Sequence, residues 1–252
     1  MLRHTITLLG IAAALSASGC GSQTPDQTQA TTSTNTAEGL WSGTTNTNQT
    51  LTAAVLDDGT YYFFYSDVLN PNKIAGVIQG TGTSNNGSFT STNAKDFGIG
   101  VAALDATLSA DSATRQFLNG TITHSGAGPV PFTSSYNNAY DTAPTVASLA
   151  GVYNGQAGSS GGVRAATVTA SDHGTFTGIE PESKCTFTGT VTARTRGSVF
   201  DQSITFGGAA CFFLNSTFQG IVYFDIPTQR LLAAAPNNNR TDAAIFFGTK
   251  IP

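Results

Sequence analysis

The sequence predicts an all-β protein with two related antiparallel β-barrel or barrel-like sandwich units and a short helical connection. Three observations support this fold class. The composition is typical of β-strand surfaces, apolar and polar side chains alternate with a period of two residues, and one strand-opening pattern occurs at both residue 39 and residue 151.

The composition indicates a secreted β-rich protein. Of 252 residues, 39% are hydrophobic and only 10% are charged, whereas a typical globular domain has about 25% charged residues. Threonine, serine, asparagine and glycine replace the missing charges, and they suit strand surfaces and turns. The length allows one large domain or two small ones. The formal net charge of -4 disfavours a nucleic-acid-binding surface.

Residues 1–19 are typical of a lipoprotein signal peptide. Arg3 precedes an apolar run at residues 6–15, and small residues lead up to Cys20. The apolar run is shorter than the roughly 20 residues that span a bilayer. Small residues directly before a cysteine resemble the lipobox of bacterial lipoproteins, although Ala17 stands where leucine is commonest. The alternative is an ordinary secretory signal, cleaved near Ala17 or Gly19.

The lipobox resemblance implies that Cys20 carries the lipid anchor, with palmitate among its acyl chains, and becomes the mature N-terminus. Gly21 and Ser22 follow it, so the acidic residue of an inner-membrane retention signal is absent. We therefore expect a lipid-anchored outer-membrane protein that faces the periplasm or the cell surface. Residues 20–37 form the lipidated cysteine and a flexible polar tether, because this segment has no large apolar side chain.

Two β-rich units, residues 38–143 and 144–252, follow the tether. Residues 39–43 (Gly-Leu-Trp-Ser-Gly) are echoed by residues 151–155 (Gly-Val-Tyr-Asn-Gly). After each opening, an apolar strand meets a turn that contains aspartate and glycine, then threonine and an aromatic residue, as in a hairpin. The repetition predicts an internal duplication.

Short strands with frequent turns fill both units. The alternation is clearest at residues 185–194, where Cys, Phe, Gly, Val and Ala alternate with Thr and Arg. Further strands are expected at residues 75–82, 87–91, 99–108, 132–136, 199–206, 218–224, 230–234 and 243–249. About eight strands a unit can close an up-and-down barrel and remove exposed sheet edges. The alternative is one sandwich built from both units. A short helix is expected only near residues 144–149.

Cys185 and Cys211 are the two cysteines that remain once Cys20 is acylated. In an oxidising compartment such a pair is expected to form a disulfide. The alternative is two buried thiols.

The sequence favours a protein that is not an enzyme and that needs no cofactor or metal. The mature chain retains only His124 and His173, too few for a three-histidine metal site. Both are expected to be solvent-exposed turn residues. Asp57 with Asp58, and Glu180 with Glu182, are pairs that a glycosidase could use. Both pairs fall in expected turns, where acidic residues are common.

An aromatic run is the most unusual local feature. Because successive strand residues face opposite sides, both faces of this strand carry rings. One face is expected to lie in the core, and the other is a possible binding patch for a sugar, a peptide or a protein. The alternative is that it packs under a loop or against the second unit. The run consists of Tyr61, Tyr62, Phe63, Phe64 and Tyr65.

The lipidated cysteine, the tether, the paired openings and the closing strand at residues 245–250 resemble the surface lipoproteins built like transferrin-binding protein B. They resemble more closely uncharacterised proteobacterial lipoproteins with the same duplicated pattern. The resemblance covers architecture and carries no binding residue. It implies a non-catalytic β-surface with a structural role or for binding a macromolecule, such as a protein or a glycan. The alternative is a lipocalin-like carrier of a small apolar ligand, and a hydrolase is the least favoured hypothesis.

Overall fold

The computed structural model of the chain describes residues 35–252. The predicted signal peptide, Cys20 and all of the predicted tether before Asn35 lie outside the described residues. Ala37, at the end of that tether, is fully buried. Ordered packing therefore begins before residue 38, because the small side chain of Ala37 fits inside the first barrel.

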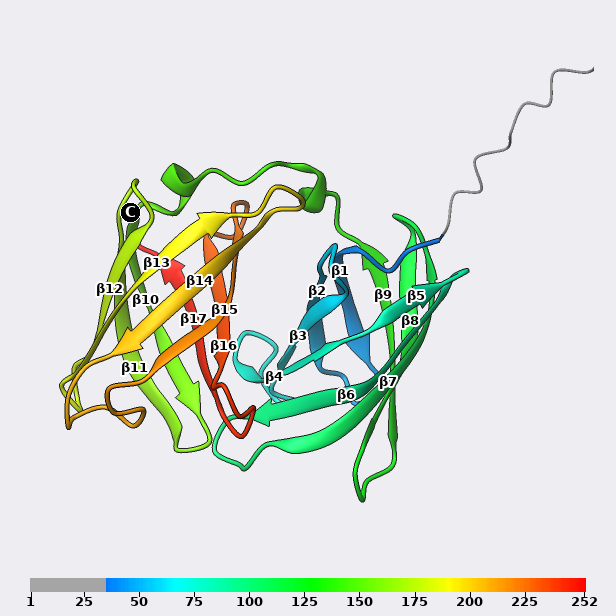
Figure 1. The fold of residues 1–252 in the computed structure, drawn as a ribbon, viewed down its shortest axis with the longest axis horizontal. Helices are drawn as coiled ribbons and strands as arrows, with labels where there is room; N and C mark the ends of the chain where they lie inside the picture. Colours follow the sequence, from blue (N-terminus) through cyan, green and yellow to red (C-terminus); the bar gives the residue numbers. More distant parts are fainter. Residues whose placement is uncertain (1–34) are drawn as a thin grey trace, which may run out of the picture. The chain divides into compact units, whose positions relative to one another are not determined.

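The first unit is a closed antiparallel barrel (Figure 1). Neighbouring strands pair in chain order, β1 pairs with β9, and a β4–β6 pairing closes the sheet, while the short β5 pairs only with β6. The strands are β1 (Gly39–Thr45), β2 (Thr50–Val55), β3 (Thr60–Ser66), β4 (Ile74–Thr81), β5 (Thr83–Asn85), β6 (Ser88–Gly98), β7 (Leu104–Ala113), β8 (Phe117–His124) and β9 (Pro129–Tyr136).

The second unit is a closed eight-stranded barrel in which β10 pairs with β17. Its strands are β10 (Gly151–Ser159), β11 (Gly162–Ala170), β12 (Thr175–Glu180), β13 (Cys185–Ala193), β14 (Val199–Phe206), β15 (Thr217–Asp225), β16 (Arg230–Pro236) and β17 (Ala243–Lys250). The predicted all-β class with two barrel units is confirmed, and the single sandwich is wrong.

Two 3-10 helices connect the barrels, η1 (Asn138–Asp141) and η2 (Val146–Leu149). The predicted short helix near residues 144–149 is therefore the single turn η2, and η1 was not predicted. Within residues 35–252, no helix is long and apolar enough to cross a membrane.

The two barrels repeat the same internal contacts. In the first, the indole N–H of Trp41 donates to the carbonyl oxygen of Ala37, four residues earlier, at 2.9 Å. In the second, the hydroxyl of Tyr153 donates to the carbonyl oxygen of Leu149, again four residues earlier, at 2.7 Å. The predicted similarity of the two units therefore extends to the hydrogen bonds at their first strands.

The expected strand at residues 99–108 is wrong in its first half. β6 continues to Gly98, and β7 begins only at Leu104. Gly100 has a φ of +82°, a left-handed conformation that suits a turn and interrupts a strand. The apolar residues 99–103 therefore form a loop between two strands.

Three apolar clusters hold the described residues together. One fills the first barrel and one lines the second. The third, here called the inter-barrel core, lies between the barrels, where side chains such as Tyr62 and Phe64 of β3 join a cluster with Tyr223 of β15 and Phe247 of β17. Polar contacts flank it, because Arg240 donates to the side-chain oxygen of Gln79 at 2.9 Å and to its carbonyl oxygen at 2.7 Å.

Each barrel has two distinct ends. We call one end the linker end, because residues 35–38 and the two 3-10 helices lie there. The opposite, distal end carries loops of both barrels. These are β1–β2, β3–β4, β6–β7 and β8–β9 of the first barrel and β10–β11, β12–β13, β14–β15 and β16–β17 of the second. The distal ends adjoin, because Gly100 N–H donates to the carbonyl oxygen of Ser159 at 2.9 Å. The linker ends adjoin as well, through a 2.7 Å ion pair between Arg194 and Asp57.

Candidate functional site

The interior of the second barrel contains a cavity of about 80 Å³. Most of its lining is apolar and comes from inward-facing residues of the strands. The lining includes Val168, Phe176, Phe187, Val191, Ile204, Val222, Leu231, Ala233 and Phe246. Apolar pockets with a few polar groups are the usual form of small-ligand sites, so this cavity is the candidate site.

Gln202 is the polar side chain buried among these apolar groups. It belongs to β14, faces the barrel interior and is only 6% exposed. Its amide nitrogen donates to the carbonyl oxygen of Ile221 at 3.1 Å. Among residues 35–252, no hydrogen bond reaches its amide oxygen. In the described residues, the fully buried side-chain polar atoms that lack a partner are Ser112 Oγ and Ser198 Oγ. The amide oxygen of Gln202 is instead open to the cavity, where a ligand hydroxyl or N–H can donate a hydrogen bond to it.

The linker end of the cavity is closed. Leu149 of η2 lines the cavity and is 2% exposed, and its carbonyl oxygen accepts the hydrogen bond from Tyr153. This contact fixes η2 across the end of the barrel. Access from the linker end would require η2 to leave its place.

The distal end of the cavity is covered by the β14–β15 loop, residues 207–216. The predicted disulfide is present, joining Cys211 of this loop to Cys185 at the start of β13. Phe213 packs against Phe206 and Phe218, with ring centroids 5.3 and 4.8 Å apart, and Phe212 is 57% exposed. The loop is therefore a disulfide-fixed cover with the ring of Phe213 packed beneath it, while the ring of Phe212 lines the cavity and is also exposed to solvent.

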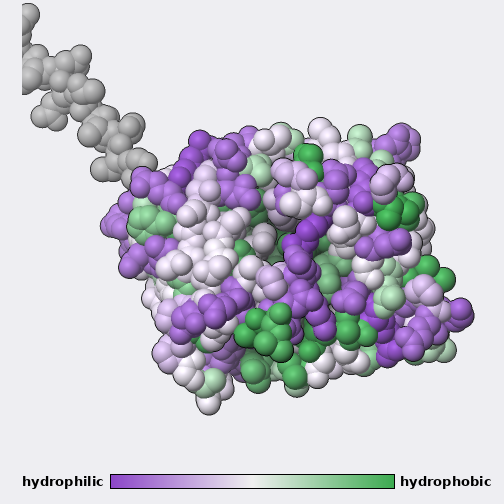
Figure 2. Space-filling model, turned by 180° about the vertical axis from the view of Figure 1, so that it is seen from behind, coloured by the Kyte–Doolittle hydropathy of each residue, from purple (hydrophilic) through white to green (hydrophobic). Residues whose placement is uncertain are grey.

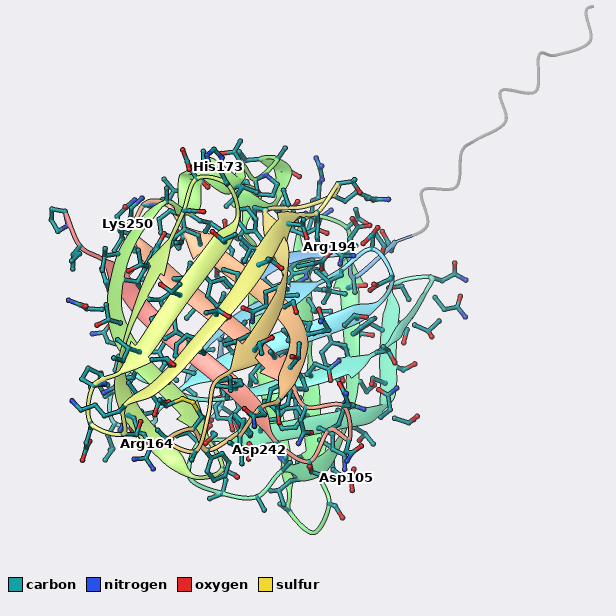
Figure 3. The ribbon with its side chains drawn as sticks, turned by 60° about the vertical axis from the view of Figure 1, so that its left-hand side comes forward. Asp105, Arg164, His173, Arg194, Asp242 and Lys250 are labelled. Carbon is teal, nitrogen blue, oxygen red and sulfur yellow. A yellow bond between two sulfur atoms is a disulfide. The ribbon has the colours of Figure 1, made fainter. Side chains whose placement is uncertain are left out.

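The polar rim of the cavity lies at the same distal end. Ser159, Arg164 and Glu180 line it, and Arg164 Nε lies 3.8 Å from a carboxylate oxygen of Glu180. Figure 3 shows Arg164 and Asp242 at the lower, distal end of the second barrel and His173 at the opposite end. The rim offers charges of both signs to a ligand that reaches out of the cavity.

Large rings also pack along the interior of the first barrel. Trp41, Tyr61, Phe63 and Phe89 are all fully buried in its core. Tyr61 lies edge-on to Phe63 and Phe89, with centroid distances of 5.3 and 5.7 Å. The second barrel also has inward-facing rings, such as Phe176, Phe187 and Phe246, but these leave a cavity between them.

A polar network lies at the distal end of the first barrel. Asp96 of β6 accepts hydrogen bonds from the ring of His124 and from the hydroxyl of Tyr65, each at 2.7 Å. The hydrogen bond to Asp96 raises the pKa of His124 above its usual value. We expected His124 to be an exposed turn residue, but it is a largely buried partner of Asp96. The reason is that β8 continues to His124 and directs its side chain toward the barrel interior.

The aromatic run on β3 is covered, so it is not an exposed binding patch in this structure. Tyr61 and Phe63 face the first barrel's interior, and Tyr62 and Phe64 pack in the inter-barrel core. Tyr65 is half-buried and bonded to Asp96. The alternative interpretation, packing against the second unit, describes the outer face of this strand.

The other acidic and histidine candidates do not assemble into a site. Asp57 and Asp58 both contact Arg194, at 2.7 and 3.6 Å, and the hydrogen bond from Arg194 lowers the pKa of Asp57. Glu180 accepts a hydrogen bond from Ser183 in the β12–β13 turn, and His173 is exposed. In the part of the chain that the structure describes, no group of histidine, cysteine and acidic residues is arranged to hold a metal ion.

Sequence reasoning missed Gln202 and Arg164. Gln202 lies at an inward position of a strand that otherwise alternates Phe200, Ile204 and Phe206 with polar residues. The signal that could have identified Gln202 is that a polar residue occupies one of the alternate positions that are otherwise apolar. Arg164 gave no signal of its own, because its role depends on the barrel closing around it.

Comparison with known protein families and with curated proteins found no match to this chain.

Proposed function

We propose that the second barrel binds a small, mainly apolar molecule that carries a hydroxyl or N–H donor. The observation that carries the proposal is the apolar cavity with the unpartnered amide oxygen of Gln202 in its wall. Such a site would hold the apolar part by burial and orient the ligand by one hydrogen bond. The first barrel would then serve as the rigid support.

The size of the cavity limits what it takes without rearrangement. About 80 Å³ is smaller than the roughly 150 Å³ of an engineered cavity that binds benzene or xenon. A short alkyl chain or a xenon atom is therefore the right size of probe. A larger ligand would have to displace Phe213 beneath the disulfide-fixed loop.

The test is a titration with straight-chain 1-alkanols, followed by NMR shifts of residues that line the cavity. Affinity should rise about fourfold for each added CH₂, which corresponds to about 0.8 kcal/mol, until the chain outgrows the cavity. Ala233→Leu, which fills the cavity, should weaken binding at every chain length. Affinity that does not depend on chain length, or shifts spread over the outer surface, would refute the proposal.

The role of Gln202 is tested with 1-pentanol and its isomer ethyl propyl ether, which cannot donate a hydrogen bond. Gln202→Leu should reduce the preference for the alcohol by about 2- to 10-fold, the worth of one net hydrogen bond. Gln219→Leu, on the outward face of the neighbouring strand β15, is the matched control and should leave the preference unchanged.

We further propose that the chain works in the cell envelope as a lipoprotein anchored through Cys20. The lipobox resemblance supports this, and two closed barrels after a polar segment match the architecture of lipoproteins built like transferrin-binding protein B. The neutral polar outer faces of strands such as β13 suit a structural role or contact with another macromolecule. Palmitate labelling that persists in a Cys20→Ala variant would contradict the anchor, and protease shaving of whole cells would locate the barrels.

A further inference from the structure

Most of the large apolar side chains that are exposed among residues 35–252 lie at the distal end of the two barrels. Leu69, at the tip of the β3–β4 loop, is 94% exposed. The β6–β7 and β14–β15 loops contribute similar side chains. Those named in this argument are Val68, Leu69, Val101, Leu104, Phe212 and Leu214, and we call them the distal apolar rim. Figure 2 shows hydrophobic residues gathered along the lower edge of the molecule.

Hydrogen bonds connect the loops of the rim into one continuous edge. Ile99 N–H donates to the carbonyl oxygen of Ala75, which places the β6–β7 loop beside the strand that follows the β3–β4 loop. The bond from Gly100 to Ser159 then joins the β6–β7 loop to the β10–β11 turn. Gly161 in that turn lies under the ring of Phe212. The rim therefore runs across both barrels to the cover of the cavity.

The shape of the rim suits a fluid surface. Its side chains project from separate loop tips, and the β3–β4 loop is held in shape because Asp67 accepts a hydrogen bond from Leu69 N–H at 2.8 Å. Separate projecting tips can each enter a lipid layer, which deforms around them, whereas a rigid partner would need a matching pocket for every tip.

The charges near the rim indicate which lipid surface it fits. Charges of both signs are present around the distal loops. Lys73, Arg164 and Lys184 are positive, and Asp67, Glu180 and Glu182 are negative. Without an excess of positive charge, anionic headgroups offer no strong attraction. Burial of apolar side chains in a zwitterionic bilayer is the favourable contribution.

The position of the rim relative to the N-terminal segment is also informative. Thr36 N–H donates to the hydroxyl of Thr114 in the β7–β8 turn, so residues 35–38 lie at the linker end. The rim is at the opposite end of the strands. It can therefore contact a lipid surface independently of any anchor that precedes residue 35.

We propose that the distal apolar rim docks onto the surface of a zwitterionic lipid bilayer, with Leu69 inserted among the headgroups and acyl chains. The cavity cover, which carries Phe212, then faces the bilayer. An apolar ligand could pass between lipid and cavity without crossing water. The docking itself does not depend on the cavity being a binding site.

The experiment places an environment-sensitive nitrobenzoxadiazole fluorophore on Leu69→Cys in the full chain, with Cys20→Ala so that this site is neither labelled nor acylated. Phosphatidylcholine vesicles should shift the emission of this fluorophore to the blue. The matched control is Ile226→Cys, a 57% exposed residue in the β15–β16 turn at the linker end, whose emission should not change. An N-terminal segment that binds vesicles by itself would instead affect position 226.

A blue shift at position 69 alone, unchanged by added salt, supports the proposal. No shift at position 69, or an equal shift at both positions, overturns it. A shift that requires phosphatidylglycerol and disappears in salt also overturns it, because charge would then drive binding. As a second measurement, Val68→Ser with Val101→Ser should weaken vesicle binding about ten-fold or more. Because alkanol titration needs no vesicles, failure of docking and failure of the cavity proposal are distinguishable.

Discussion

The two aromatic faces of β3 allow the coupling between the barrels to be measured. Phe64, 2% exposed, packs in the inter-barrel core, whereas its neighbour Phe63, fully buried, packs inside the first barrel against Phe132 at 5.6 Å. Truncating a buried phenylalanine to alanine costs about 3–5 kcal/mol. We expect both Phe63→Ala and Phe64→Ala to lower the free energy of unfolding by about this amount. Only Phe64→Ala should also weaken the coupling that makes the two barrels unfold together.

The chain has a single tryptophan, Trp41, which is fully buried in the first barrel. Its fluorescence therefore follows the unfolding of the first barrel, while far-UV circular dichroism follows both. In guanidinium chloride the two signals should coincide for the natural sequence and for Phe63→Ala, and they should separate for Phe64→Ala. Leu69→Ala, at a position that is 94% exposed, is the control and should change stability by about 0.5 kcal/mol or less.

Two results would refute this reasoning. If the two signals already separate in the natural sequence, the inter-barrel core does not couple the barrels. If Phe64→Ala costs less than about 1 kcal/mol, its ring is not packed as described.

Three further predictions concern the disulfide, the buried histidine and a close strand approach. Replacing Cys185 and Cys211 by serine should lower the free energy of unfolding by about 3.5 kcal/mol, from the loop-closure relation for a separation of 26 residues, as measured by calorimetry. His124→Gln should destabilise the protein by about 1.5–3 kcal/mol at pH 5.5 and by less at high pH. Because the pKa of His124 is raised in the folded state, its stabilising effect is fully present below its usual value of 6.5 and is lost as the pH rises through the folded-state value. Gly155→Ala should destabilise by more than about 1 kcal/mol in thermal unfolding, because its Cβ would lie 2.1 Å from the carbonyl oxygen of Phe247.

Each of these predictions has a matched control. Reduction of the natural disulfide should reproduce the serine variant, and a stability that is unaffected by either change would contradict the first prediction. His173→Gln, at an exposed turn, should leave the pH dependence as it is; if His124→Gln does the same, the second is wrong. Gly126→Ala, with no atom within 4 Å of its Cβ, is the spatial control for the third, and its own cost measures strain from a φ of +80°.

Much of the fold could be predicted because strand periodicity and the repeated opening are local in sequence. The alternation at residues 185–194 corresponds to β13, and the matched glycines at 39 and 151 each begin a first strand. Errors occurred where apolar residues have another role. Residues 99–103 read as a strand but form a loop, and Ala37 appeared to be tether but fills the barrel end.

The candidate site was less predictable, because it is formed by side chains that face one another across the barrel from strands far apart in sequence. The disulfide partners could be paired by elimination, but Gln202 acquires its meaning only from the apolar side chains opposite it. The two faces of β3 could be told apart by alternation, yet what covers the outer face depends on β15 and β17, which are distant in the chain. Such non-local contacts leave no local pattern.

Xenon binding tests the central claim most directly, because xenon has no polar group and binds by filling an apolar cavity. Crystals pressurised with xenon should show an anomalous peak inside the second barrel, against the side chains of Val222 and Ala233, and Ala233→Leu should abolish it. No peak there in the natural sequence, or the main peak inside the first barrel, would contradict the assignment of the second barrel as the ligand-binding one.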